Sequence, residues 1–221
     1  MSNHIFLVGA SRGVGKEIAK FLTAQSTKVT ALLRTDTARA DIEGMGAQVV
    51  LGDALNSADI ESAMSTAEPI DAVISTIGGL PGESVRPDYL GNKNLIDAAV
   101  KAGVKKFILV TSIGTGNSVD ALPPQALETL KPVLIEKDKA EQYLMQSGLN
   151  YTIVRPGGLK SEAATGNGVL TEDTSVVGSI HRADVAQQVC RCLDWEKANN
   201  KVLSAVDKNM LFGQAPFEEF N

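Results

Sequence analysis

Short apolar runs alternate along this chain with segments in which apolar side chains recur every three or four residues. The runs are of strand length, whereas the segments between them have one apolar and one charged face, as amphipathic helices do. The predicted strands are 5–8, 29–33, 48–51, 71–76, 107–110, 151–154 and 201–206. Few polar residues interrupt these runs, which is typical of parallel strands covered on both faces. The pattern predicts an α/β fold with one doubly wound parallel sheet and helices on both of its faces.

A glycine-rich turn lies between the first predicted strand and the first predicted helix. Gly9 can make the tight turn, Gly13 lets the backbone approach a phosphate, and Gly15 lets the helix pack closely on the strand. The spacing is Gly-x3-Gly-x-Gly rather than Gly-x-Gly-x2-Gly, so the position between strand and helix is the stronger signal. A dinucleotide pyrophosphate would bind at the bare N–H groups of such a helix start. The sequence therefore predicts a Rossmann-type cofactor site that includes Gly9, Ser11, Arg12, Gly13, Val14 and Gly15.

The end of the second predicted strand bears on which nicotinamide cofactor binds. An acidic residue there would accept hydrogen bonds from a ribose 2′-OH, whereas an arginine suits a 2′-phosphate. The residue is Arg34, and Arg12 can make a second charge-assisted contact from the glycine turn. Asp36 is close enough to reach a ribose diol instead, and Arg34 can also be a solvated charge at a strand end. We predict NADPH rather than NADH.

The other strand ends meet at the same edge of the sheet, where such folds bind their ligands. Asp53 can accept the adenine amino group, or it can cap the helix that begins near Ala58, with Ser57 as a competing cap. Small residues after the fourth strand leave space for a ligand. The further cofactor-binding residues predicted at this edge are Asp53, Ala54, Thr76, Ile77 and Gly78.

We expect residues 1–221 to form a single domain, with a substrate pocket made by the loops at the carboxyl edge of the sheet. Residues 80–87 and 159–175 are predicted loops, and Pro132 is predicted to open a helix. The net charge of −5 argues against a nucleic-acid partner, which calls for a basic surface. No apolar run approaches the roughly 20 residues of a membrane helix.

Several absences complete the sequence-based expectations. The first strand starts within four residues of the N-terminus, so we expect no signal peptide. Cys190 and Cys192 are the only cysteines and cannot easily pair with each other, which fits a reducing cytoplasm. Two scattered histidines predict no metal site. No long apolar helix face is left over, so we expect a monomer.

Motifs along nearly the whole chain, to about Val206, resemble the atypical short-chain dehydrogenase/reductases. The segments that carry the resemblance are 9–15, 52–53, 110–114, 139–141 and 153–158. Within that superfamily the chain is similar to the NmrA-like NAD(P)H-binding group, which includes biliverdin reductase B, also a flavin reductase. The motifs in this order are specific for the superfamily and much less so for a substrate.

The resemblance implies roles for residues at the nicotinamide end of the site. Ser112 matches the serine beside the nicotinamide and is the candidate catalytic residue. Lys139 matches the lysine of the Tyr–Lys acid–base pair, but Ile135 stands four residues earlier, where the tyrosine is expected. We interpret Tyr143 as a core residue. The cofactor-binding residues implied here are Thr111, Ser112, Lys139, Pro156, Gly157 and Gly158.

The segment 181–184 resembles the entry to a late helix of the same group. We interpret Asp184 as a helix cap and Arg182 as structural. His181 has a suitable pKa range for acid–base chemistry, but a histidine without a visible partner is more often structural.

Two functions of different classes follow. The first is an NADPH-dependent reductase that transfers hydride to a small-molecule acceptor, a flavin or a linear tetrapyrrole, with the proton drawn from water. The second is a non-catalytic NADP(H)-binding redox sensor or assembly factor, which the missing tyrosine favours. The same absence counts against a third reading, a sugar-nucleotide epimerase.

Overall fold

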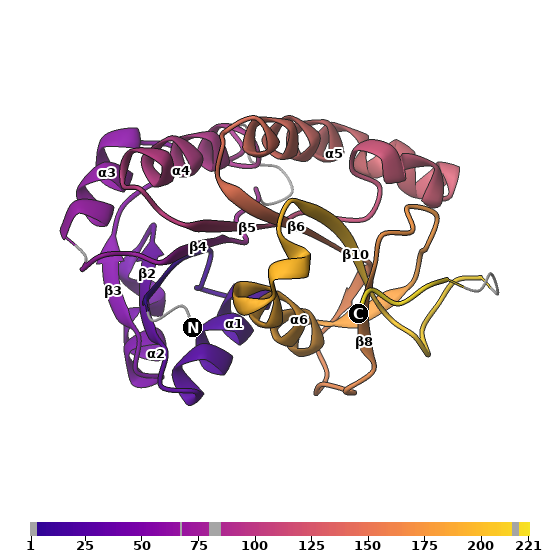
Figure 1. Ribbon diagram of the computed structural model, residues 1–221, viewed down its shortest axis with the longest axis horizontal. Helices are drawn as coiled ribbons and strands as arrows, with labels where there is room; N and C mark the ends of the chain where they lie inside the picture. The colour runs from indigo at the N-terminus through magenta and orange to yellow at the C-terminus, as the bar shows by residue number, and fades with distance from the viewer. Residues whose placement is uncertain (1–3, 67, 80–84, 214–216) are drawn as a thin grey trace.

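The computed structural model describes residues 4–66, 68–79, 85–213 and 217–221, and it contains one large, mostly parallel sheet (Figure 1). The order of the eight strands is β3-β2-β1-β4-β5-β6-β10-β8, and all neighbours pair in parallel except β10 and β8. The strands are β1 (His4–Val8), β2 (Lys28–Leu33), β3 (Gln48–Leu51), β4 (Ala72–Ser75), β5 (Lys106–Val110), β6 (Asn150–Pro156), β8 (Gly168–Thr171) and β10 (Lys201–Asp207). The order 3-2-1-4-5-6 is that of the Rossmann fold, so the predicted doubly wound sheet is confirmed.

In the part of the chain that the structure describes, three helices cover each face of the sheet (Figure 1). One layer consists of α1 (Gly13–Ala24), α2 (Arg39–Gly44) and α6 (Arg182–Asp194). The other consists of α3 (Ser57–Thr66), α4 (Leu90–Lys101) and α5 (Pro124–Met145). A small second sheet pairs β7 (Gly158–Lys160) with β9 (Ser179–His181), and the 3-10 helices are η1 (Asp36–Ala38), η2 (Gly116–Ala121) and η3 (Glu196–Ala198).

The central strands are apolar without interruption because both of their faces are buried. In β1, Ile5 and Leu7 pack in the core beneath α1 and α6, whereas Phe6 and Val8 pack in the core beneath α3, α4 and α5. Successive side chains of a strand point to opposite faces, so one apolar strand supplies both cores. The pattern seen in the sequence therefore has a direct structural cause.

Two local predictions differ from the structure. Pro132 lies inside α5 on its exposed side and does not open the helix, which begins at Pro124 after the extended residue Pro123. Proline at the first position of a helix has no hydrogen bond to lose, so the Pro123-Pro124 pair was the true start signal. Residues 159–175, predicted as loop, contain most of β7 and all of β8. Most of the predicted loop 80–87 lies outside the described residues.

The cysteines are free and buried on α6. Burial raises the pKa of the Cys190 thiol to about 12 and that of Cys192 to about 11. Since the thiolate is the reactive form, neither side chain is suited to redox chemistry in the folded protein. Within the described ranges, no helix has the length and apolar character needed to cross a lipid bilayer.

Candidate functional site

A cleft of about 1460 Å³ opens at the carboxyl edge of the large sheet. It is lined by residues at or just after the ends of β1, β2, β3, β4, β5 and β6, together with parts of α1, α5 and α6. Most of the predicted site residues meet here: Gly9, Ser11, Arg12, Gly13, Val14, Arg34, Asp53, Ala54, Thr76, Ile77, Gly78, Thr111, Ser112 and Pro156. Four predicted residues, Gly15, Lys139, Gly157 and Gly158, do not line it.

The glycine turn is shaped by close backbone contacts. Gly9 has a left-handed φ of +97°, and a side chain there would collide with Thr76, whose Oγ1 shares its proton between the carbonyls of Val8 (3.3 Å) and Gly9 (3.4 Å). Any Cβ on Gly15 would overlap the Gly9 carbonyl oxygen. Gly15 therefore brings α1 against the strand end, and it acts through packing rather than by lining the cleft.

The start of α1 has the properties of an anion site. Its N-cap residue, Arg12, is extended and makes no side-chain capping bond, and the first turn contains no acidic residue. The amides at this end are thus left to a ligand, and the helix dipole favours a negative one. The donor set fits the diphosphate of a dinucleotide.

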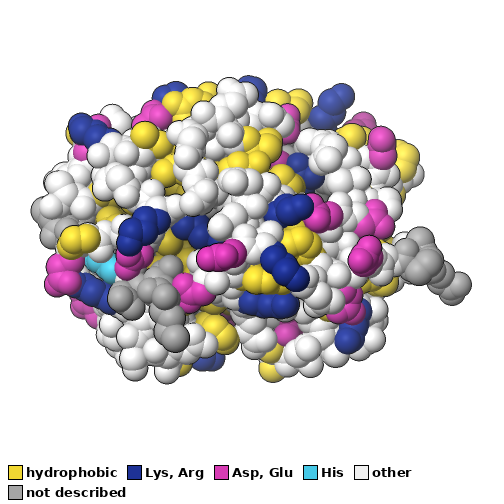
Figure 2. Space-filling model, viewed as in Figure 1, with side chains coloured by type: hydrophobic (Ala, Val, Ile, Leu, Met, Phe, Trp, Pro, Cys, Tyr) yellow, Lys and Arg dark blue, Asp and Glu magenta, His cyan; other side chains and the backbone are white. Residues whose placement is uncertain are grey.

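Charges in the cleft differ from those of the chain as a whole. Acidic and basic side chains are interspersed on the face seen in Figure 2, and the chain has a net charge of −5. The basic residues that line the cleft outnumber the acidic ones: Arg12, Lys16, Lys20, Arg34, Lys137 and Arg182 against Glu17, Asp53 and Glu162. Asp36 lies outside this lining, and its carboxylate accepts a 2.5 Å hydrogen bond from Arg39 Nε.

The turn after β3 contains a different helix cap from the two predicted. The Oδ1 atom of Asp53 accepts a hydrogen bond from the Leu55 amide at 2.9 Å, which holds the turn after β3. Asn56 caps α3, since its Oδ1 accepts the Ala58 amide at 3.1 Å. Neither Asp53 nor Ser57 is therefore the cap. Asp53 lines the cleft, and its contact with adenine stays a prediction.

The lysine at the other end of the cleft is Lys137 rather than Lys139. Lys139 is exposed and pairs with Glu136 at 2.6 Å. Lys137 Nζ lies 3.1 Å from a carboxylate oxygen of Asp88, which is fully buried. The helical repeat explains the difference, because positions three, four and seven apart share one face of α5. The α5 residues that line the cleft are Leu130, Val133, Leu134 and Lys137.

In a Tyr–Lys pair the proton-transferring tyrosine would stand one helical turn before the cleft lysine Lys137. Val133 stands there and also lines the cleft, whereas Ile135, the position chosen from the sequence, is half exposed on the outer side of α5. A valine cannot transfer a proton, so the Tyr–Lys pair is absent at the corrected position as well. Tyr143 packs partly buried against the core and donates a hydrogen bond to Asp97 at 2.5 Å, which agrees with its interpretation as a core residue.

Ser112 lies on the cleft wall above a buried polar network. Its Oγ donates to the Ile113 carbonyl at 3.0 Å, and the neighbouring Thr111 hydroxyl donates to Glu141 at 2.6 Å. Glu141 also receives a bidentate contact from Arg155, with distances of 3.1 Å from Nε and 2.5 Å from Nη2. Both ionised side chains are almost fully buried. The network joins β5, α5 and β6, and it fixes the backbone next to Ser112.

Gly157 and Gly158, which follow β6, do not line the cleft. The Gly157 amide donates to the Ala205 carbonyl at 2.9 Å, and the Gly158 amide donates to the Gly178 carbonyl at 2.8 Å. Of this motif only Pro156 lines the cleft. A glycine is needed at position 157, where the chain passes Gly178, because a Cβ there would overlap the Gly178 carbonyl oxygen.

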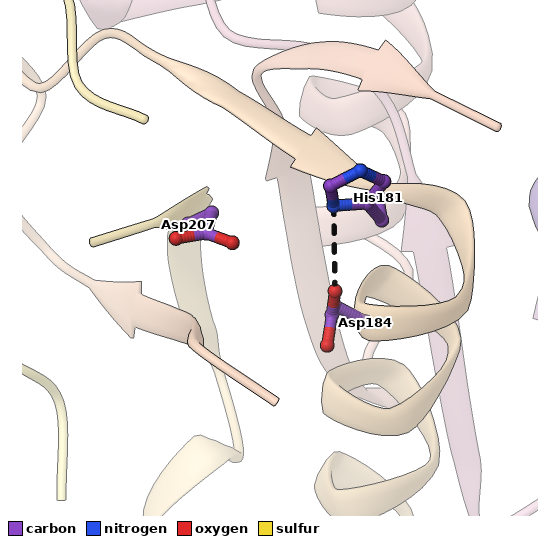
Figure 3. Close-up of side chains that lie close together, drawn as sticks. All are labelled: His181, Asp184 and Asp207. Carbon is purple, nitrogen blue, oxygen red and sulfur yellow. Dashed lines mark ion pairs between the residues drawn. The ribbon is translucent and has the colours of Figure 1, made fainter. Parts of the chain in front are cut away.

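His181, Asp184 and Asp207 form a buried cluster beside the cleft (Figure 3). Asp184 accepts the amides of Thr165 and Gly166, each at 2.9 Å, so it caps this turn and not its own helix as predicted. The Thr165 hydroxyl lies 2.5 Å from Asp207 and 3.2 Å from Asp184. The carboxylates thus fasten the segment before β8, and the absence of a metal stays a prediction.

The fold and the cleft define an NAD(P)H-binding Rossmann protein, and comparison with known proteins agrees. The pattern of the NAD(P)H-binding family matches residues 9–196, and the chain belongs to this family. Its sequence and fold fit the atypical short-chain dehydrogenase/reductases of the NmrA-like group.

Several relatives are similar over nearly the full length of the chain. The structure of ChuY, an anaerobilin reductase from Escherichia coli O157:H7, is 34% identical with a TM-score of 0.85, over 93% of this chain and 98% of that one. Sanguinarine reductase of Eschscholzia californica is 31% identical over 96% of this chain and 91% of its own. An uncharacterized sugar epimerase of Bacillus subtilis, YhfK, is 32% identical over 97% of both. The chain is thus an oxidoreductase-like member of its family.

The buried network makes a testable prediction for Glu141. A Glu141→Ala variant leaves the Arg155 guanidinium buried without its carboxylate, so the free energy of unfolding should fall by about 3–5 kcal/mol. Urea denaturation followed by circular dichroism measures the change. Glu136→Ala is the control on the same helix, because its exposed pair with Lys139 should contribute at most about 1 kcal/mol. Equal effects of the two substitutions would contradict the assigned network.

Proposed function

We propose that the protein is an NADPH-dependent reductase that transfers hydride to a planar conjugated acceptor, a flavin or a linear tetrapyrrole. The observation that carries the proposal is a cleft with two chemically different ends. One end presents the amides of the α1 N-terminus among arginines, and the other presents apolar α5 side chains around Ser112 and Lys137. The two named reductases among the relatives support the reaction class.

The choice of NADPH rests on the region after β2. Arg34 lines the cleft where an adenosine ribose would lie, and Asp36, the residue that favoured NADH, is paired with Arg39 outside the lining. A guanidinium suits the additional phosphate of NADPH, whereas a ribose diol would call for a free carboxylate.

The side chains at the proposed acceptor end are suited to orienting the acceptor and excluding water rather than to acid–base catalysis. Leu130, Val133 and Leu159 supply apolar surface to the cleft. Ser112 can orient an acceptor through its hydroxyl, and the Lys137 ammonium is held by Asp88 at 3.1 Å. Bound NADPH would supply the hydride. An acceptor that stabilises the added charge by conjugation, and takes its proton from water, needs no tyrosine.

A second candidate is a non-catalytic NADP(H)-binding sensor or assembly factor. Val133 in the place of a proton-transferring tyrosine favours it. Turnover separates the two candidates. A monomeric protein in the cytoplasm, acting on a small molecule rather than on nucleic acid, remains part of the proposal.

Purified protein should oxidise NADPH when FMN is added and should not oxidise it alone. Absorbance at the nicotinamide band follows the reaction, with the free flavin and NADPH mixture as the control. If NADPH binds but flavins, quinones and tetrapyrroles all leave the absorbance of the nicotinamide band unchanged, the reductase function is refuted and the sensor function is favoured.

A Ser112→Ala substitution should reduce turnover by about 2- to 10-fold, the range for a neutral hydrogen bond, and leave NADPH affinity intact. Steady-state rates and a fluorescence titration of NADPH give the two quantities. Unchanged turnover would remove Ser112 from the mechanism.

An Arg34→Ala substitution should weaken NADPH binding by about 1.5–3 kcal/mol, the range for a hydrogen bond to a charged group, and leave NADH nearly unaffected. Titration with both cofactors measures the difference. Lys139→Ala is the matched control, since that lysine lies outside the cleft and should not alter either affinity. A similar loss for both cofactors would show that Arg34 does not bind the 2′-phosphate.

A further inference from the structure

Arg182 lies where three parts of the cleft meet. It is the first residue of α6, which packs beside α1, so the starts of both helices face the cleft. Its Nε atom is 3.7 Å from the position that a Cβ on Gly13 would occupy. Its Nη1 atom donates a 2.7 Å hydrogen bond to the Ser161 hydroxyl. The guanidinium therefore spans from the glycine turn to the segment 161–164, which lines the cleft.

The neighbours of Arg182 hold its backbone in place. His181 and Asp184 point together into the buried cluster, with His181 Nδ1 at 3.8 Å from the Asp184 carboxylate (Figure 3). Asp184 in turn binds the amides of Thr165 and Gly166. Arg182 and the end of the segment 161–164 are thus fastened to the same rigid point. At its other end the segment is held by the Ser161 contact with Arg182 and by Glu162, whose carboxylate lies 3.5 Å from His181 Nε2.

We propose that Arg182 binds the diphosphate of the nicotinamide cofactor and, through Ser161, couples cofactor binding to the position of the segment 161–164. The site at Gly13 belongs to the diphosphate, because the N-terminus of α1 has no side-chain cap there. A guanidinium has five N–H donors in a planar fork, so Nη1 can keep Ser161 while Nε and Nη2 donate to phosphate oxygens. The inference rests on dinucleotide binding and does not require turnover.

This role differs from that of Arg34. Arg34 follows β2, at the ribose that distinguishes the two cofactors, whereas Arg182 lies over Gly13, at the group that NADPH and NADH share. Removal of Arg34 should therefore change the preference between NADPH and NADH, whereas removal of Arg182 should leave that preference unchanged.

The first experiment measures dissociation constants of NADPH and NADH by fluorescence titration for four proteins. Arg182→Met should weaken the binding of both cofactors by about 10- to 100-fold and leave the ratio of their dissociation constants unchanged. This is the effect expected when charged hydrogen bonds to a group that both cofactors share are lost. Arg34→Ala should change the ratio instead. Ser161→Ala should leave both constants within about twofold, since that hydroxyl supports the arginine but donates nothing to the phosphates. Unchanged constants for Arg182→Met, or a loss confined to NADPH, would overturn the proposal.

The second experiment tests the coupling without catalysis. Backbone amides of residues 161–164 should exchange more slowly with deuterium when NADP⁺ is added to the unaltered protein. The protection should disappear in Arg182→Met and in Ser161→Ala at saturating NADP⁺. Equal protection in all three proteins would refute the coupling.

Two controls separate the possible failures. Arg182→Lys retains the charge and should weaken binding less than Arg182→Met, and it replaces that variant in both experiments if the methionine protein does not fold. Thermal unfolding without cofactor reports folding. If the protein binds NADPH but does not oxidise it with any acceptor, the reductase function is refuted, whereas the role of Arg182 in cofactor binding is not.

Discussion

The contact between the start of α1 and the end of β1 is the constraint on which the site depends. Gly15 approaches the Gly9 carbonyl so closely that a single methyl group would separate helix and strand, and Thr76 of the neighbouring β4 end ties the same turn. This packing brings the uncapped N-terminus of α1 to the carboxyl edge of a sheet whose other strands end there too. An anion site and a ligand cleft therefore arise from one close approach of backbone to backbone.

The remainder of the cleft is arranged by polar groups that are themselves buried. The pair of Glu141 and Arg155 fixes the strand ends beside Ser112, and Asp88 pairs with Lys137, which lines the cleft. Asp184 and Asp207 fasten Thr165, which follows the cleft-lining residues 161–164. Burying such a group costs free energy unless it has a hydrogen-bond or ion-pair partner. The partners therefore favour one arrangement of the walls around an otherwise open cleft.

The structure brings some of the predicted site residues to the cleft and places others away from it, and a common reason explains the difference. Residues directly after apolar strands were found because a parallel sheet brings all such ends to one edge. Lys139 was misassigned because its motif fixed a position along the chain, whereas the rotation of α5 decides which lysine faces the cleft. Asp184 was read from its place at a helix start, but its hydrogen-bond partners lie nearly twenty residues earlier.

The sequence by itself determined the alternation of strand and helix, the glycine turn and the basic residue after β2, because each depends on neighbours within about thirty residues. Tertiary structure decided which face of α5 lines the cleft, which carboxylates are satisfied, and that Arg182 reaches Gly13. The reach of Arg182 depends on how α1 and α6 pack, although about 170 residues separate the first turns of these helices. Local patterns specify elements, whereas contacts between distant elements specify which side chains meet a ligand.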